Sequence, residues 1–168
     1  MNAASKMTFV VAAALAGMAP ASAQDQGRAS VVQPSNPNTE IIRSAFDAWA
    51  AGGTRFFDDV LSPDVRWTIR GSGPVARTYL GKDDFVREAA APLAARLAGP
   101  IKPTVRHLLA DGDLVVAIWD GAAVAHDGKP YNNSFVWIFR MQGGKAVEVE
   151  AFLDLDRYYE VLRRVPVR

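Results

Sequence analysis

The fold is decided by residues 104–155, which read TVRHLLADGDLVVAIWDGAAVAHDGKPYNNSFVWIFRMQGGKAVEVEAFLDL. β-branched and aromatic residues dominate this stretch, and three turn signals interrupt it, at Asp111-Gly112, Asp127-Gly128 and Gly143-Gly144. They predict an antiparallel meander of four strands over about residues 104–110, 114–125, 131–141 and 145–155. Strands of this length must twist and curl, because the usual strand has only about 5 to 6 residues.

Apolar residues with the spacing of helices come before the meander in the sequence. A first helix should begin near Asn38 or Thr39, either of which can cap it, and should stop at Gly52-Gly53. Its apolar stripe follows the helical period and consists of Ile42, Ala45, Phe46, Trp49 and Ala50. A short helix over about residues 54–61 and a strand over residues 65–69 should follow.

A third helix is predicted over about residues 82–97, although Pro92 must kink or split it. A last helix, over residues 156–164, ends the predicted elements. Helices first and then a long curled sheet are typical of an α+β fold, in which the helices cover one face of the sheet.

The N-terminus has the pattern of a secretory signal peptide. Lys6 precedes the apolar residues 7–19, and Ala21-Ser22-Ala23 offers an A-x-A cleavage site. A membrane anchor is the alternative, but an apolar run this short falls below the roughly 20 residues of a spanning helix. We therefore expect a signal peptide over residues 1–23, a flexible leader over residues 24–37 and one domain over residues 38–164. The cleaved protein should be periplasmic or secreted, with no membrane attachment.

Composition excludes several classes of function. The 168 residues include 19 Lys and Arg against 18 Asp and Glu, so a formal net charge of +1 gives no electrostatic reason to bind nucleic acid. The absence of cysteine excludes disulfides, a cysteine nucleophile and thiolate metal sites. The two histidines lack the spacing of metal ligands. We expect neither a metal nor a cofactor.

The alternation of side chains sorts the last strands into two faces. Tyr131, Asn133, Phe135, Trp137 and Phe139 share one face of their strand. The same period-two count places Glu150, Phe152 and Asp154 together on the last strand. Apolar residues occur on both faces, so one face should meet the helices and the other a second subunit. This predicts a homodimer.

Polar residues within the apolar runs are candidates for function, and each has a structural alternative. Asp154 could be a general base in an apolar pocket, or it could cap the helix that begins near Asp156. His107 could face the pocket or be a hydrogen-bonded core residue. Asn133 could orient a ligand or satisfy neighbouring backbone. Glu150 is best explained as a solvated residue or as the ion-pair partner of Arg106 or Arg140.

The order of several motifs resembles a known family. The chain is similar over residues 38–162 to SnoaL-like domains of the nuclear transport factor 2-like superfamily, which includes ketosteroid isomerases, limonene epoxide hydrolases and polyketide cyclases. The motifs that carry the resemblance are Asp64-Val65-Arg66-Trp67, Tyr79-Leu80-Gly81-Lys82-Asp83, Ala110-Asp111-Gly112-Asp113-Leu114-Val115, Gly144-Lys145 and Phe152-Leu153-Asp154. The resemblance implies a cone-shaped α+β roll, with a curved, mostly antiparallel sheet wrapped around N-terminal helices. It also implies an apolar, aromatic pocket for a small hydrophobic molecule, and dimers formed through the sheet.

The resemblance also assigns roles to residues. Asp154 matches the aspartate that can act as a general base in catalytic members, and Trp67 and Trp119 match aromatic positions of the family. Independently of the resemblance, the position of His107 within an apolar run makes it the second catalytic candidate. The candidate ligand-binding residues are Trp49, Trp67, Tyr79, Trp119, Asn133 and Phe152. Phe152 stands where a tyrosine is usual. Glu150 stands where an arginine is common, and the loss of that arginine argues against epoxide hydrolysis, because the paired aspartates of those enzymes depend on one.

Three functions remain open from the sequence. The first is cofactor-free proton transfer, of the isomerase or cyclase type, with Asp154 as the base. The second is a non-catalytic module that holds a small hydrophobic molecule in the periplasm. The third is a dimeric interaction module whose interior is filled by its own side chains.

Overall fold

The computed structural model describes residues 36–167, so the predicted signal peptide and nearly all of the predicted leader lie outside the described residues. The helices and strands, in chain order, are α1 (Pro37–Ala50), α2 (Phe56–Val60), β1 (Leu61–Ile69), β2 (Thr78–Leu80), α3 (Lys82–Phe85), a π-helical turn η1 (Val86–Ala90), α4 (Ala91–Ala94), β3 (Lys102–Asp111), β4 (Leu114–Val124), β5 (Pro130–Gln142), β6 (Lys145–Leu153) and α5 (Leu155–Arg164). Among these helices, none is long and apolar enough to cross a membrane.

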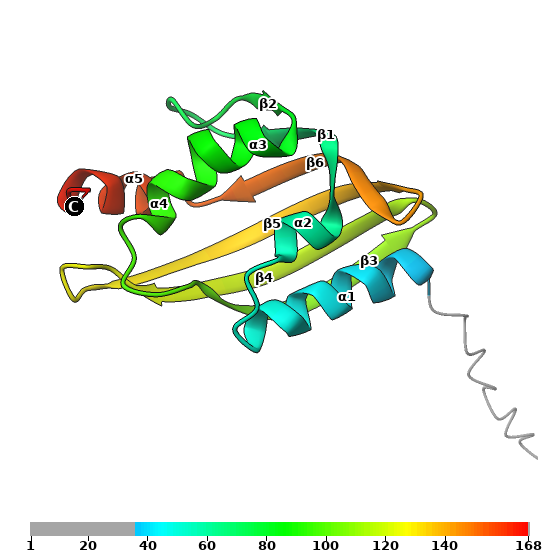
Figure 1. The fold of residues 1–168 in the computed structure, drawn as a ribbon, viewed down its shortest axis with the longest axis horizontal. Helices are drawn as coiled ribbons and strands as arrows, with labels where there is room; N and C mark the ends of the chain where they lie inside the picture. Colours follow the sequence, from blue (N-terminus) through cyan, green and yellow to red (C-terminus); the bar gives the residue numbers. More distant parts are fainter. Residues whose placement is uncertain (1–35, 168) are drawn as a thin grey trace, which may run out of the picture. The chain divides into compact units, whose positions relative to one another are not determined.

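The strands form one six-stranded sheet in the order β2-β1-β6-β5-β4-β3. Figure 1 shows the sheet curving behind α1, α2 and the α3–α4 segment, with α5 at one end. The predicted meander is confirmed as β3 to β6, whose neighbours pair antiparallel. The α+β fold, with a curved and mostly antiparallel sheet packed against the N-terminal helices, is therefore confirmed. Two features were not predicted: the short edge strand β2, and the parallel pairing of β1 with β6.

The first helix begins earlier than predicted. Its cap is Asn36, whose side chain accepts a hydrogen bond from the backbone N–H of Asn38 at 2.9 Å. Pro37 is the first helical residue, a position where the missing N–H of proline costs nothing. The predicted caps, Asn38 and Thr39, are therefore wrong, and Pro37 belongs to the helix rather than to the leader.

Pro92 splits the third predicted helix, as expected. Proline has no N–H to donate to the carbonyl four residues earlier. The backbone before it widens into η1, and the N–H of Ala91 donates to the carbonyl of Val86, five residues back. The helix ends at Ala94 instead of Leu97, because Leu97 forms an isolated β-bridge with Ala125.

Two β-bulges reverse the alternation that the sequence suggested. In β3 the register shifts between Val105 and His107, which places His107 opposite Ile118 on the outer face of the sheet. In β6 the register shifts beside Val147, so that Ala146 and Val149 both face inward. A bulge inserts one unpaired residue, and every later side chain of the strand then changes face.

The C-terminal helix is tied to two other segments. The guanidinium of Arg164 donates to the carboxylate of Asp127, which lies in the β4–β5 turn, and to the carbonyl of Pro130, the first residue of β5. Arg96, which follows α4, donates to the carbonyl of Val165 at 2.9 Å. These bonds hold α5 and the segment after α4 against the end of the sheet.

Candidate functional site

A cavity of about 280 Å³ lies between the inner face of the sheet and the helices. Its wall is formed by Trp49, Gly53, Thr54, Phe57, Trp67, Ile69, Phe85, Ala89, Ala90, Leu93, Ala94, Leu97, Gly99, Pro100, Ile101, Trp119, Phe135, Trp137, Ala151, Leu153 and Tyr158. Thr54, Ala94, Gly99 and Pro100 are exposed residues, so the cavity meets the solvent between the α1–α2 loop and the segment before β3.

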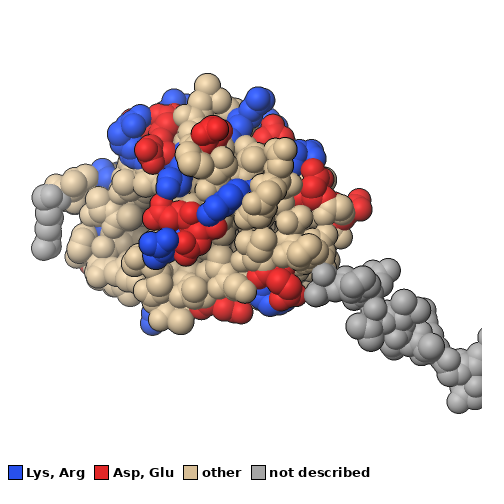
Figure 2. Space-filling view, turned by 45° about the vertical axis from the view of Figure 1, so that its right-hand side comes forward, with Lys and Arg blue, Asp and Glu red and all other residues tan. Residues whose placement is uncertain are grey.

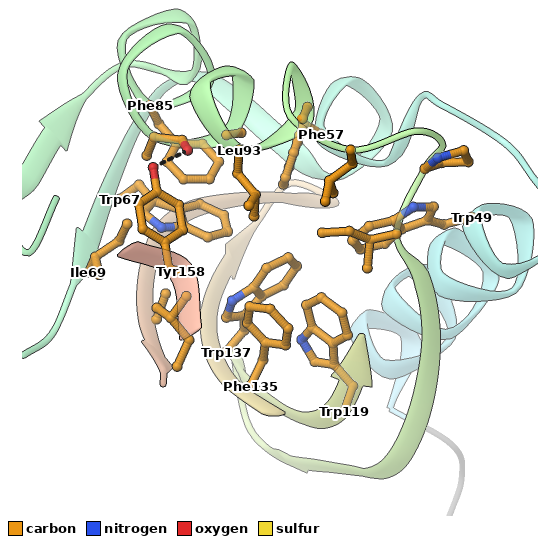
Figure 3. Close-up of a pocket in the computed structure, with 18 of the residues that line it drawn as sticks. Trp49, Phe57, Trp67, Ile69, Phe85, Leu93, Trp119, Phe135, Trp137 and Tyr158 are labelled. Atoms are coloured by element: carbon orange, nitrogen blue, oxygen red, sulfur yellow. Dashed lines mark hydrogen bonds between the residues drawn. The ribbon is translucent and has the colours of Figure 1, made fainter. Parts of the chain in front are cut away.

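Trp137 is the centre of the aromatic wall (Figure 3). Its indole meets the indoles of Trp67 and Trp119 edge to face, at centroid distances of 5.1 and 4.6 Å. Trp67 in turn stacks on Phe85 at 3.9 Å, and Trp119 stacks on Phe135 at 4.0 Å. Each ring is thus fixed by at least two others, and the wall is a preorganised aromatic surface.

A glycine makes room for part of this wall. A Cβ on Gly121 would lie 2.8 Å from Cγ2 of Ile101 and 3.0 Å from ring carbons of both Trp119 and Phe135. Gly121 faces inward on β4, two residues after Trp119. Only a residue without a side chain lets these three neighbours approach one another here.

The cavity wall carries almost no polar chemistry. None of the lining residues is an aspartate, glutamate, histidine, lysine or arginine. The hydroxyl of Tyr158 donates to the carbonyl of Ala89 in η1 at 2.9 Å, and burial raises the pKa of this phenol, which keeps it protonated. The only other hydroxyl belongs to Thr54, at the opening. The lining offers no ligand set for a metal ion, and residues 36–167 contain no cluster of three such side chains.

Three of the predicted ligand-binding residues line the cavity. Trp67 and Trp119 are buried in its wall, and Trp49 is partly exposed near its opening. Since Trp137 also lines it, all four tryptophans of the chain surround one space.

Asp154 lies outside this cavity. Its carboxylate caps α5 by accepting hydrogen bonds from the backbone N–H groups of Asp156 (3.0 Å) and Arg157 (3.3 Å), and its side chain is 55% exposed. The capping alternative is therefore confirmed. The residue borders a separate, polar depression whose wall also includes Thr104, Asp120, Asn132, Asn133, Ser134 and Arg157.

Asn133 clamps the junction between β6 and α5 and does not line the cavity. Its amide nitrogen donates to the carbonyl of Asp154 and to the hydroxyl of Tyr131, and its amide oxygen accepts from the N–H of Asp154. Burial raises the pKa of Tyr131 to about 12, so this phenol stays neutral. The structural alternative for Asn133 is confirmed.

The remaining predicted site residues are dispersed. His107 is exposed on the outer face of β3, and Phe152, 41% exposed, lies on the outer face of β6. The two bulges explain both placements, and the structure does not bring His107 and Asp154 together at the cavity. Tyr79 is buried beside the cavity, where its hydroxyl donates to the carbonyl of Val75 at 2.8 Å.

Glu150 also faces outward, and its ion-pair partner is Arg70 at 2.9 Å rather than Arg106 or Arg140. This pairing lowers the pKa of the Glu150 carboxyl.

Most of the cavity residues that come from helices were not predicted from the sequence. Phe57 comes from α2, Phe85 from α3 and Leu93 from α4, and Tyr158 reaches the cavity from α5. Their signal was present, since each is an apolar or aromatic residue on a predicted helix. What was missing was the direction in which each short helix faces.

Comparison with known proteins relates this fold to a described family. The family model of the SnoaL-like domain matches residues 42–149. TerC, co-crystallised with polyporic acid, is 24% identical with a TM-score of 0.62, over 76% of this chain and 99% of TerC. An NTF2-like protein from Burkholderia thailandensis is 21% identical with a TM-score of 0.61, over 74% and 96% of the two chains.

A proposed SnoaL-like polyketide cyclase from Jannaschia sp. CCS1 is 20% identical with a TM-score of 0.61, over 80% of this chain and 99% of that one. At these identities, the likeness establishes the fold. A comparison with curated protein sequences finds no match.

Proposed function

The chain belongs to the SnoaL-like domain family, and on that premise we propose that it binds a small, uncharged hydrophobic molecule in the aromatic cavity. The observation that carries the proposal is the composition of the wall, which is aromatic and aliphatic and holds no ionisable group except the neutral phenol of Tyr158. Ligand pockets are typically apolar spaces of this kind with a few polar groups.

Physical chemistry limits the ligand class. Each Å² of apolar surface removed from water contributes about 25 cal/mol, so a hydrophobic molecule gains affinity from contact with the rings. A carboxylate or ammonium would lose its hydration with no partner of opposite charge, which is far more costly than any contact it makes. The cavity therefore selects uncharged molecules.

Fluorescence tests this proposal directly, because all four tryptophans surround the cavity. Titration of the full chain with the uncharged dye N-phenyl-1-naphthylamine should quench tryptophan emission and raise dye emission to saturation. Ala94→Trp should weaken binding at least tenfold, because Ala94 lines the cavity. Ala95→Trp is the matched control, because Ala95 is the exposed neighbour of Ala94 and does not line the cavity. No saturable binding, or equal binding by both variants, would refute the proposal.

Proton transfer with Asp154 as the base is the second candidate function. Its support is the polar depression that Asp154 shares with Asp120 and Arg157, together with the cyclase named among the structural neighbours. A substrate would have to place its reacting carbon in this depression, outside the aromatic cavity. The reaction would need no cofactor.

We also propose a homodimer through the outer face of the sheet. Two rows of apolar side chains cross the middle of this face: Phe152, Val136 and Ile118 in one, and Ile138, Val116 and Leu109 in the other. Ion pairs such as Arg70–Glu150 and Arg106–Asp120 border them. Because these charges are paired, the outer face can meet a second copy of itself without like-charge repulsion. On the side of the molecule that Figure 2 shows, acidic and basic side chains are also interspersed.

Export to the periplasm or beyond, after cleavage behind Ala23, is proposed from the N-terminal pattern alone.

A further inference from the structure

One helical segment forms both a buried part of the cavity wall and a part of its opening. In this segment α3, η1 and α4 follow one another without a break in the coil (Figure 1), and the backbone angles at both junctions are helical. Phe85, which stacks on Trp67, lines the cavity from the buried first part of the segment. Ala94, an exposed residue at the end of α4, lines it at the opening. Phe85 and Leu93 both point from this segment toward the cavity (Figure 3).

An uninterrupted α-helix could not present both Phe85 and Ala94 to one cavity. The two residues are nine positions apart, which at 3.6 residues per turn is about 2.5 turns, so their side chains would lie on opposite sides of the helix. The wide turn η1 takes up one extra residue, because the N–H of Ala91 donates to the carbonyl of Val86, five residues back. The effective spacing is then about 2.2 turns, and both side chains lie on the same side.

Pro92 accounts for the wide turn. It has no N–H for the carbonyl of Glu88, four residues earlier, and in an α-helix its ring would collide with that carbonyl. The hydroxyl of Tyr158 donates to the carbonyl of Ala89 within η1 at 2.9 Å, so the wide turn is also bonded to α5. Pro92 is not one of the residues that line the cavity, and its effect on the wall is therefore indirect.

We propose that Pro92 is a positioning residue of the binding site: it keeps η1 wide, and η1 holds Phe85 and Ala94 on the side of the helix that faces the ligand. This inference rests on the proposed binding function and names a residue that sets the shape of its site. Without the proline, the helix can close to α-helical geometry, and the residues after it turn by about 100° relative to Phe85. Leu93 then takes the place of Ala94, and its larger side chain narrows the opening.

The number of residues in the helix provides the test. Pro92→Ala removes the cause of the wide turn, and deletion of the exposed Glu88 removes the extra residue that the turn takes up. Each change alone should put Phe85 and Ala94 out of phase. Each should then weaken the binding of N-phenyl-1-naphthylamine to the full chain about tenfold, the value of one large apolar contact.

The two changes together should restore binding. They give an ordinary α-helix in which Phe85 and Ala94 have their native phase, because the residue that η1 takes up is no longer present. The double variant should bind the dye with the affinity of the wild type and unfold at the same urea concentration or a higher one. If Pro92 affected stability alone, the two changes would add to each other instead of compensating.

Two controls separate the side chains from the residue count. Glu88→Ala removes the same carboxylate as the deletion but keeps the number of residues. Pro63→Ala removes a proline at an exposed position of β1, outside the cavity wall. Both variants should bind the dye as the wild type does, and a loss of affinity in Glu88→Ala equal to that of the deletion would overturn the argument from phase.

The outcomes are distinct. Full affinity in Pro92→Ala, or a double variant that binds no better than the weaker single variant, would overturn the proposal and leave the binding function intact. If a single variant does not fold, the double variant still decides, because it should both fold and bind. Failure of the wild type to bind the dye would overturn the binding function, and this inference with it.

Discussion

The indole of Trp119 lies flat on the ring of Phe135, with centroids 4.0 Å apart and 8° between the planes. The two residues are cross-strand partners, directly opposite each other on β4 and β5. The register of the central hairpin therefore sets the stack, and the stack forms one side of the cavity. A change in strand pairing would alter the binding surface at once.

Gly121→Ala should disturb this stack. The added methyl group would lie within 3.0 Å of Trp119, Phe135 and Ile101, all of which line the cavity. Overpacking of this kind costs about 1–3 kcal/mol of stability, measurable by urea denaturation, and we expect weaker binding of an uncharged dye.

Gly99→Ala is the matched control for that variant. A Cβ at Gly99 meets nothing within 4 Å, so the substitution should leave stability unchanged or raise it by up to about 1 kcal/mol. Equal stability of the two variants would contradict the close packing at Gly121.

Substitutions of Asp154 separate capping from catalysis. Asparagine also caps helices well, so Asp154→Asn should leave the unfolding free energy nearly unchanged, whereas Asp154→Ala should lower it by about 0.5–2 kcal/mol. Calorimetry of the two variants checks this. If the protein transfers protons by the second candidate mechanism, Asp154→Asn would abolish turnover without changing stability.

The ion pair of Asp127 and Arg164 predicts a pH dependence of stability. The hydrogen bond from Arg164 lowers the pKa of Asp127 in the folded state, so the pair stabilises the protein above about pH 4 and is lost as pH falls through the folded-state pKa. The melting temperature of Asp127→Asn should lie below that of the wild type at pH 7, and the difference should shrink below about pH 4.

The control for this titration is Asp47→Asn, at an exposed position of α1. The difference in melting temperature between Asp47→Asn and the wild type should not show the same change with pH. A difference for Asp127→Asn that stays constant from pH 7 to pH 3 would exclude the ion pair as its cause.

The proposed dimer can be broken at one position. Ile138→Glu places a charge in the apolar centre of the outer sheet face, opposite Val116 and Glu150. Sedimentation at micromolar concentration should show a dimer for the wild type and for the exposed-loop control Ala98→Glu, and a monomer for Ile138→Glu. A monomeric wild type would count against the dimer.

The proposed export predicts the mass of the mature protein. The chain expressed with its N-terminus should be recovered from the periplasm or medium with Gln24 as its first residue. Intact mass spectrometry reads this directly. A full-length product in the membrane fraction would instead favour an anchor.

The sequence predicted the fold better than the site, and the two bulges explain the difference. Turn signals such as Asp111-Gly112 locate strands well, because they act locally. Which face a side chain occupies depends on every residue between it and the turn. One extra residue near Arg106 moves His107 outward, and one near Val147 does the same to Phe152. Nothing in the local sequence marks either insertion.

The pairing of strands that are distant in the sequence was the other feature that could not be predicted. The family resemblance correctly placed Trp67 at the cavity, but the parallel neighbour of its strand was not foreseen. The capping role of Asp154 was available from the sequence as an alternative, since aspartate directly before a helix is a common cap.

The parallel pairing of β1 with β6 also has a consequence for the order in which the polypeptide acquires its structure. Trp67 on β1 is opposite Val149 on β6, so β1 has no neighbour on that side until the ribosome has made almost the whole chain. Once their strands have been made, the hairpins of β3, β4, β5 and β6 join adjacent segments and can form quickly, whereas the contact between β1 and β6 joins distant segments and should close more slowly. We therefore expect Trp67 to lack its β6 neighbours until synthesis is nearly complete, and exposed apolar surface of this kind makes a partly folded chain prone to aggregation.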